Sequence, residues 1–149
     1  MLRVTKLTDY ATLVLSVLAQ KPEAIHSATE LAELAHLELP TVAKLLKPLT
    51  QANLVKSFRG VSGGYRLARD PRQISLIDVV EAMEGPLGMT ECSLHSGNCG
   101  IEDSCRTRGN WQRINDVVVD ALRNFKLSQM HSSSRSSKPK TIPAKLALD

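Results

Sequence analysis

The chain has 149 residues and a mass of 16.3 kDa, which suits one main domain or a small domain with an appendage. Hydrophobic residues make up 42% and aromatic residues only 3%, so the expected core is built from Leu, Val, Ile and Ala. The apolar stretches are interrupted well before the roughly 18 residues of a membrane span, and the N-terminus lacks a signal-peptide pattern. These features predict a cytoplasmic protein with no membrane partner.

The net charge of +4 is unevenly distributed along the chain. Residues 1–72 carry ten Lys/Arg and six Asp/Glu, residues 73–125 carry four and eight, and residues 126–149 carry five and one. A basic N-terminal part suggests a polyanionic partner such as nucleic acid. An excess of this size is also common on ordinary protein surfaces, so charge alone does not decide the function.

The N-terminal third has the pattern of a helix-turn-helix. Apolar residues at helical spacing from Leu7 to Leu18 predict a first helix, which Thr5 or Thr8 would cap. The segment 27–30, Ser-Ala-Thr-Glu, has the form of a capping box for a short second helix. After a tight turn, Pro40 stands where a helix start tolerates proline. Two short helices joined by a tight turn are typical of DNA-binding proteins.

A glycine-rich hairpin is expected directly after the third helix. Residues 54–58 and 65–67 read as short strands, and residues 59–64 contain three glycines, which favour a hairpin tip with positive φ angles. A helix-turn-helix followed by a hairpin is a winged helix. The predicted fold is therefore mainly α with a small β-hairpin wing, and residues 1–72 form the DNA-binding unit.

Four residues are candidate DNA contacts. A recognition helix presents its N-terminal residues to the major groove, which singles out Thr41 and Lys44 as base readers or phosphate contacts and Lys47 as a phosphate contact. Arg59 at the wing tip could enter a narrow minor groove. Pro48 conflicts with a long third helix, because proline removes a backbone bond. We expect this helix to end or kink near Lys47, or to be shorter.

The C-terminal half is expected to contain two more helices and a tail. Residues 73–87 form a connecting helix that buries Leu76, Val79, Val80 and Met83, and residues 106–127 form a long helix. In the latter, apolar residues are spaced 3, 4, 3 and 4 apart, as in a coiled coil. These residues are Trp111, Ile114, Val118, Ala121 and Phe125. The pattern favours a dimerisation helix. Residues 128–149 are predicted to be a disordered basic tail.

Cys92, Cys99 and Cys105 are the only cysteines, and they lie in a polar segment of residues 88–105. Three soft thiolates this close favour iron–sulfur or zinc chemistry. The odd number argues against a disulfide framework. The alternative is three ordinary thiols, or a redox pair with one to spare. No phosphate-binding glycine loop, nucleophile elbow or paired catalytic constellation is present, so we do not expect an enzyme.

Together these features resemble the Rrf2 family of bacterial winged-helix regulators over residues 1–130. The matching segments are the opening LRVTKLTDYA of residues 2–11, the winged unit from Leu45 to Leu67, and the three-cysteine loop. Residues 89–92 and 105–115 look most like the branch that regulates the SUF iron–sulfur assembly operon.

The resemblance implies a homodimer that binds a palindromic operator in double-stranded DNA. It also implies an iron–sulfur cluster, 2Fe–2S or 4Fe–4S, held by the three cysteines. We therefore expect a cluster-sensing regulator, acting as a repressor of suf- or isc-type assembly genes. The alternatives are a nitric-oxide or redox sensor of the same family, or a winged-helix DNA-binding protein stabilised by zinc.

The fourth cluster ligand is open at this stage. In the IscR branch a histidine lies three residues after the last cysteine, and here that residue is Arg108. The NsrR branch uses an aspartate near the N-terminus of the other subunit, and Asp9 matches that position. His95, between the first two cysteines, is a further option. Another residue or solvent could also fill the position.

Overall fold

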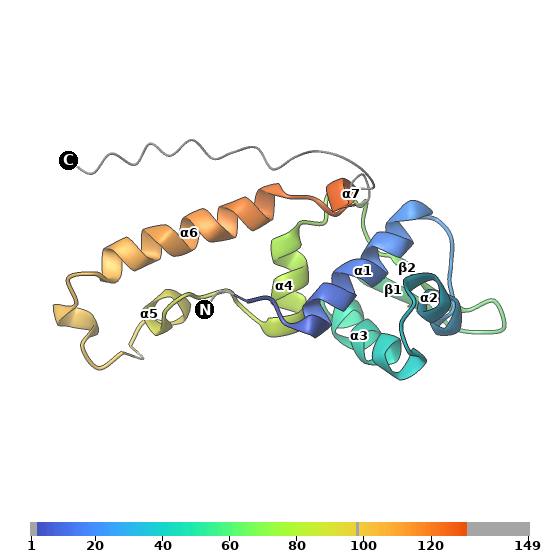
Figure 1. Ribbon diagram of the computed structural model, residues 1–149, viewed down its shortest axis with the longest axis horizontal. Helices are drawn as coiled ribbons and strands as arrows, with labels where there is room; N and C mark the ends of the chain where they lie inside the picture. The colour runs from blue at the N-terminus through green and yellow to red at the C-terminus, as the bar shows by residue number, and fades with distance from the viewer. Residues whose placement is uncertain (1–2, 98, 131–149) are drawn as a thin grey trace.

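The computed structural model describes residues 3–97 and 99–130, and it confirms a mainly helical fold with one antiparallel hairpin (Figure 1). The elements, in chain order, are α1 (Lys6–Gln20), α2 (Ala28–Ala35), α3 (Leu39–Gln51), β1 (Val55–Phe58), β2 (Gly64–Leu67), α4 (Leu76–Glu84), α5 (Glu91–Leu94), the 3-10 turn η1 (Glu102–Ser104), α6 (Arg108–Asn124) and α7 (Leu127–Met130). Over these ranges no helix is long and apolar enough to cross a membrane.

The helix starts follow the capping residues in the sequence. Thr5 caps α1, with its hydroxyl accepting the N–H of Thr8 at 3.2 Å. Ser27 and Glu30 form the predicted capping box of α2. Each such cap satisfies backbone N–H groups that the first helical turn leaves unpaired. The starts of α1 and α2 are therefore determined by local sequence.

The turn between α2 and α3 is closed by a left-handed residue. His36 has a φ of 53°, and the N–H of Leu37 returns to the carbonyl of Ala32 at 2.9 Å. Helix α3 then starts at Leu39 and continues through Pro48 to Gln51. The expectation that this helix would end near Lys47 or be shorter was therefore wrong, and the alternative of a kink near Lys47 stays a prediction. Its buried residues, Val42, Leu45, Leu46 and Leu49, lie on both sides of Pro48, and their packing holds the helix together.

The wing is a two-stranded hairpin whose glycines are required by close packing. Strand β1 pairs with β2 in the register Val55 to Leu67 and Phe58 to Gly64. A Cβ at Gly63 would lie 2.4 Å from the carbonyl oxygen of Phe58, and one at Gly64 would lie 2.4 Å from that of His26. His26 also exchanges two backbone hydrogen bonds with Tyr65, at 2.9 and 2.7 Å. The hairpin is thus fastened to the loop before α2.

One apolar core joins the helix-turn-helix to α4 and α7. Its fully buried large side chains are Leu15, Leu18, Leu31, Leu45, Leu49, Leu54, Ile74, Leu127, Val14, Val42, Val55 and Val79. Helix α4 is capped by Ser75 and Asp78 as a second capping box. Ile77 of this helix is buried, while Leu76 and Met83 are only half-buried, so the predicted inner face was partly wrong.

The long helix is shorter than predicted. Helix α6 ends at Asn124, where the backbone becomes extended at Phe125. The Phe125 carbonyl accepts the Leu76 N–H at 3.0 Å, and the Leu127 N–H donates to the Ile74 carbonyl at 2.8 Å. These bonds replace the helical ones and return the chain to the winged unit. Residues 127–130, which include the start of the predicted tail, form α7 instead, and residues 131–149 lie outside the described part.

The two functional regions lie at opposite ends of the molecule's long axis. Figure 1 shows the hairpin, α2 and α3 at one end, and α5, η1 and the start of α6 at the other. Helix α6 packs against α4 and α5 and runs from the cysteine end to the region above α4 (Figure 1). Helix α4 in turn packs against α3, so α6 and α4 connect the cysteine segment to the DNA-binding helix.

Candidate DNA interface and cysteine segment

Helix α3 has an exposed outer face opposite its buried stripe. Pro40, Ala43, Lys44, Lys47 and Gln51 are exposed and follow each other at spacings that share one side of a helix. We call these five residues the recognition face. Thr41 is half-buried and lies on the flank of α3, outside this face. The structure thus exposes Lys44 and Lys47 on one face, with Thr41 beside Lys44 at the edge of that face.

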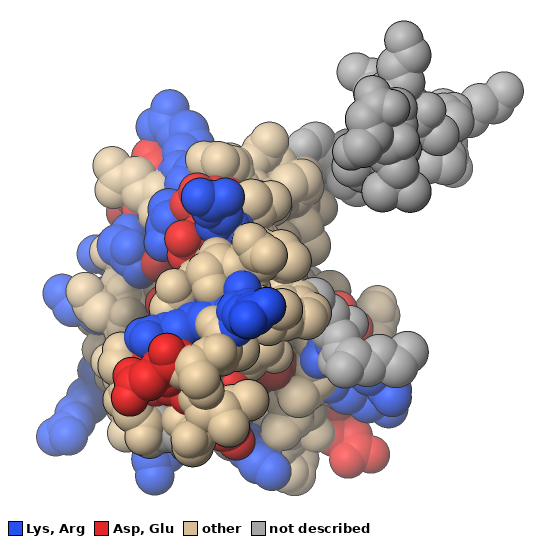
Figure 2. Space-filling model, turned by 90° about the vertical axis from the view of Figure 1, so that its left-hand side faces the viewer, with Lys and Arg blue, Asp and Glu red and all other residues tan. Residues whose placement is uncertain are grey.

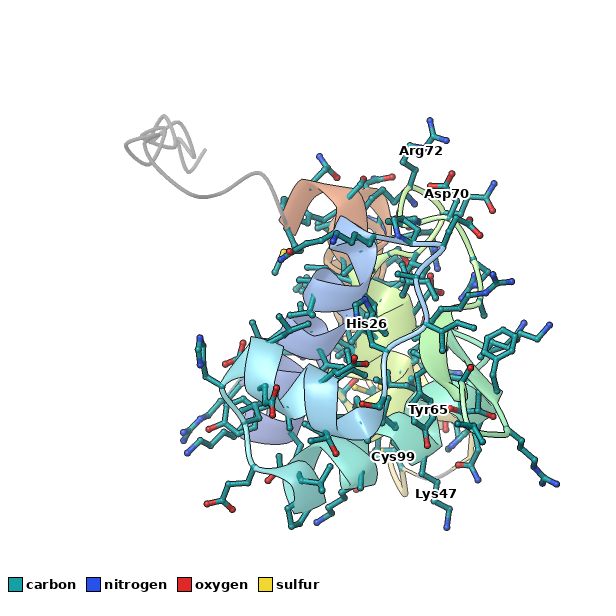
Figure 3. The ribbon with its side chains drawn as sticks, turned by 90° about the vertical axis from the view of Figure 1, so that its right-hand side faces the viewer. His26, Lys47, Tyr65, Asp70, Arg72 and Cys99 are labelled. Carbon is teal, nitrogen blue, oxygen red and sulfur yellow. The ribbon has the colours of Figure 1, made fainter. Side chains whose placement is uncertain are left out.

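A shallow groove of about 270 Å³ joins the recognition face to the wing. It is lined by residues of α3 and of both strands: Ala43, Leu46, Lys47, Thr50, Gln51, Ser57 and Tyr65. Figure 3 shows Lys47 and Tyr65 at the same end of the winged unit, with Arg72 at the other end. The α3 and wing surfaces are therefore contiguous, as contact with one stretch of DNA requires.

The wing carries more positive charge than Arg59 alone. Arg59 is exposed at the hairpin tip. Behind it, the Lys56 ammonium lies 5.6 Å and the Arg66 guanidinium 5.0 Å from the centre of the Phe58 ring. Such cation–π contacts orient long basic side chains. Sequence reasoning did not single out Lys56 or Gln51, although Gln51 could have been found because it lies seven residues, or two turns, after Lys44.

The cysteine segment, residues 88–105, is folded against the first half of α6. The Met89 N–H donates to the Asn115 side-chain oxygen at 3.0 Å. The Glu102 carboxylate pairs with the Arg108 guanidinium at 2.5 Å and accepts the Gly97 N–H. Asn115 and Glu102 are both buried, at 7% and 8% exposure. Because Arg108 and Asn115 are two turns apart, both anchors lie on one face of α6.

The three thiols are free and half-buried. The Cys92 sulfur lies 3.2 Å from the Thr90 hydroxyl, and the Cys105 sulfur 3.5 Å from the Thr107 hydroxyl. Hydrogen bonds from the side chain and backbone of Thr107, with smaller effects from Arg108, lower the pKa of the Cys105 thiol. Cys105 is therefore biased towards the thiolate, the form that binds metal and reacts with oxidants.

The three cysteine thiols are suitable ligands for a cluster, but their positions in this structure are not suitable for holding one. Three thiolates are the ligand type that iron–sulfur clusters and zinc select. Within residues 3–97 and 99–130, however, no group of three or more His, Cys, Asp or Glu side chains is close enough to hold a metal ion. The cysteine segment therefore has to rearrange before the three cysteines can share one site.

Asp9 lies far from the cysteines of its own chain. It is exposed in the first turn of α1 and lines a groove of about 450 Å³ together with Leu122 and Met130. Arg108, next to Cys105, is 14 residues before Leu122 on α6, which is about 21 Å along the helix. The length of α6 thus separates the Asp9 groove from Cys105. His95 is exposed directly after α5, within the cysteine segment.

Helix α6 carries an apolar stripe that the other described residues leave largely uncovered. Trp111, Ile114, Val117 and Phe125 are 40%, 44%, 69% and 40% exposed, and Ala121 is also exposed. We call these five residues the exposed stripe. Val118, which the sequence pattern placed in the seam, is half-buried on the neighbouring face. Large exposed apolar side chains in a row are typical of an interaction surface.

The surface at the cysteine end has no strong charge of one sign. Figure 2 shows this end with Lys and Arg next to Asp and Glu, separated by uncharged residues. The basic features that would favour DNA are instead on the recognition face and the wing. The fold and these two regions define a winged-helix protein with a separate segment that carries three cysteines.

Comparison with known proteins gives the family. The profile of the Rrf2 family, described as an iron-dependent transcriptional regulator, matches residues 4–133. This chain therefore belongs to the Rrf2 family, and it is a transcriptional regulator rather than an enzyme. The family resemblance inferred from the sequence is confirmed.

Individual relatives cover most of the chain. Protein aau3 of Rhizobium meliloti (strain 1021) is 31% identical over 131 residues, which are 87% of this chain and 84% of that protein. The structure of CymR, the global cysteine regulator of B. subtilis, has a TM-score of 0.70 at 29% identity and covers 91% of this chain and all of its own. T. potens IscR has a TM-score of 0.64 at 30% identity and covers 87% and 85%.

Proposed function

We propose that this Rrf2 regulator is a homodimer that binds a palindromic operator and responds to an iron–sulfur cluster on Cys92, Cys99 and Cys105. The observation that carries the proposal is the attachment of the cysteine segment to α6 at Arg108 and Asn115. A cluster there can act on the helix that links the two ends of the molecule. The proposed targets are suf- or isc-type assembly genes, which the protein represses in the cytoplasm.

DNA recognition is assigned to the recognition face and the wing. Lys44 and Lys47 are exposed side by side, and Arg59 extends from the tip of the adjoining hairpin. A major-groove helix flanked by a wing arginine can contact both grooves at once. Thr41, on the flank of α3, is assigned to a phosphate rather than to a base edge.

The exposed stripe of α6 is assigned to the dimer. Pairing it with the same stripe of a second copy removes four large apolar side chains from water. If the two α6 helices run antiparallel, the start of one lies beside the end of the other. Each cysteine segment then comes close to the partner's groove that contains Asp9.

This arrangement favours Asp9 of the partner subunit as the fourth ligand. Within one chain the length of α6 separates Asp9 from the cysteines, whereas across an antiparallel dimer the two meet. Arg108, which replaces the histidine of the IscR branch, is engaged with Glu102 and carries no lone pair to offer a metal. A labile oxygen ligand suits a sensor, because the cluster is more readily lost or attacked.

One observation favours a second candidate, a thiol-based redox or nitric-oxide sensor. The lowered pKa of Cys105 favours its thiolate, in a segment where the described thiols are not gathered for a metal. Zinc, held by the same cysteines, is the remaining alternative, and it would stabilise the segment without a redox response.

Anaerobic purification distinguishes these candidates. The proposal predicts a brown protein with visible charge-transfer absorption and with iron and acid-labile sulfide in the dimer, all lost in a variant with Cys92, Cys99 and Cys105 changed to Ser. A colourless protein containing stoichiometric zinc would identify the zinc alternative. A colourless, metal-free protein whose DNA binding changes on oxidation would favour the thiol sensor.

A further inference from the structure

The strongest unexplained contact in the cysteine segment is the ion pair between Glu102 and Arg108. The Glu102 side chain is 7% exposed and that of Arg108 is 31% exposed. A buried charge is costly unless it is paired. This pair is therefore not an ordinary solvent-exposed ion pair, and it helps to determine the conformation of the segment.

Glu102 holds together both sides of the segment. One carboxylate oxygen accepts the Gly97 N–H, before Cys99, and the other contacts Arg108, after Cys105. The Glu102 N–H also donates to the Cys99 carbonyl at 3.1 Å, and its carbonyl accepts the Cys105 N–H at 3.4 Å. Glu102 thus contacts Gly97, Cys99, Cys105 and Arg108, with Cys99 before it and Cys105 after it in the chain.

We propose that the Glu102–Arg108 pair is a latch that holds the cysteine segment on α6 in a conformation that cannot bind a metal, and that a closed latch and a loaded cluster are alternative states. The inference deepens the proposed function and rests on it for the cluster. Its structural basis is that the latch is closed in the arrangement whose cysteines are not gathered. Gathering them has to move the turn that carries Glu102.

The latch also explains how cluster loading reaches the dimer. Arg108 is the first residue of α6, and Trp111 of the exposed stripe follows it within one turn. Opening the latch frees the first turn of α6 from the segment, while Asn115 keeps the second anchor. Arg108 is therefore a positioning residue, and its replacement of histidine gives this chain a switch element in place of a ligand.

The first test uses the metal-free full-length protein and needs no cluster. Glu102→Gln and Arg108→Gln each open the latch, and Asp103→Asn and Arg106→Gln are matched controls at exposed neighbours. We expect iodoacetamide to modify Cys99 about tenfold faster in the two latch variants, equivalent to ~1.4 kcal/mol. Cys105 is not used as the reporter, because Arg108 itself contributes to the lowered pKa of that thiol. Arg108→Lys, which keeps the charge, should largely restore the slow rate. Rates equal to those of the controls would overturn the proposal.

The second test asks whether latch and cluster compete. The double variant with Glu102→Gln and Arg108→Gln should acquire a cluster faster than the wild-type protein on anaerobic addition of iron and sulfide, and should release it more slowly. A cluster that forms less readily in the double variant would show that the pair supports binding, and would overturn the proposal. If the wild-type protein forms no cluster, the proposed function fails, while the alkylation rates still decide whether the latch exists. Thermal unfolding identifies any variant that fails to fold. If one of the single variants Glu102→Gln and Arg108→Gln does not fold, the alkylation rate of the other is compared with the controls.

Discussion

The Thr8 hydroxyl donates a hydrogen bond to the Glu84 carboxylate, which joins the first turn of α1 to the last turn of α4. The same carboxylate oxygen accepts the Thr5 N–H at 2.9 Å. Thr8 is buried, at 1% exposure. Residues 76 positions apart thus form one polar connection beside the groove that contains Asp9. This connection fixes the start of α1.

Glu84→Ala should destabilise the fold by about 0.5–2 kcal/mol at pH 7, the range for loss of a helix cap. Hydrogen bonds from Thr8, and then from Thr5, lower the pKa of Glu84 from its ordinary value of 4.5. Because the pKa of Glu84 is lower in the folded protein than in the unfolded chain, its carboxylate stabilises the fold at any pH above the unfolded-state pKa. This stabilisation is lost as the pH falls through the folded-state pKa. Urea unfolding should therefore show a difference at pH 7 that disappears in strong acid. Glu81→Ala, exposed on the same helix, is the control, and an equal loss there would contradict the assignment.

Dimerisation should depend on the exposed stripe. Ile114→Glu combined with Val117→Glu places carboxylates where two copies would meet, so we expect monomers at micromolar concentration by light scattering, and weak operator binding. Both side chains are largely exposed in the single chain, so its fold should survive. Arg123→Glu, which adds a carboxylate at an exposed position on the side of α6 opposite the stripe, should leave the dimer intact. A dimer of unchanged stability in the double variant would show that another surface pairs the subunits.

DNA binding should respond differently to the two parts of the interface. Lys47→Ala should lower the salt dependence of operator binding by about one unit of slope, because one phosphate contact is lost. Arg59→Ala should weaken binding by about 1–3 kcal/mol if its side chain enters a groove. Lys21→Ala, exposed just after α1, is the control. Salt titrations that give the same slope and affinity for all four proteins would show that the recognition face is misassigned.

Much of the winged unit could be predicted from sequence because its determinants are local. The capping box at Ser27 and the approach of Gly63 to Phe58 and Gly60 act within a few residues, and the structure contains both features. The end of α6 could not be predicted, because Phe125 leaves the helix to bond with Leu76, far away in the sequence. The apolar pattern continued past that point and predicted a longer helix.

The candidate site was predictable in composition but not in geometry. The spacing of Cys92, Cys99 and Cys105 indicated a metal-binding segment, yet nothing in that spacing shows that Glu102 organises it. A carboxylate and a guanidinium six residues apart are usually two solvated charges. Their pairing depends on how η1 meets the start of α6, which is a tertiary contact. The spatial relation between Asp9 and the cysteines was likewise not predictable, because that relation depends on how α1 and α6 pack in the fold.

The fourth ligand can be tested with mixed dimers. Asp9→Ala should leave the fold intact, since a first-turn acid contributes only about 0.3–1 kcal/mol through the helix dipole. It should shorten the lifetime of the cluster, whereas His95→Ala should not. In a mixed dimer with one cysteine-free subunit, the remaining cluster should be unstable when Asp9→Ala is in the cysteine-free subunit. It should be stable when Asp9→Ala is in the subunit that holds the cysteines.

The opposite dependence in mixed dimers would place the aspartate and the cysteines in one chain. That result would contradict the argument that Asp9, beside Leu122 at one end of α6, is too far from Arg108 at the other end. If His95→Ala, and not Asp9→Ala, alters the visible spectrum, the fourth ligand lies in the cysteine segment. The argument for a site shared between subunits would then fail.

The central claim is that the state of the cysteine segment controls operator binding. The most direct measurement is the affinity of one anaerobic preparation for an operator selected from random duplexes, before and after removal of its cluster. We predict a change of about 5- to 150-fold, the usual range of coupling between two sites, which is absent when Cys92, Cys99 and Cys105 are changed to Ser. Equal affinities for the loaded and cluster-free protein would contradict the account.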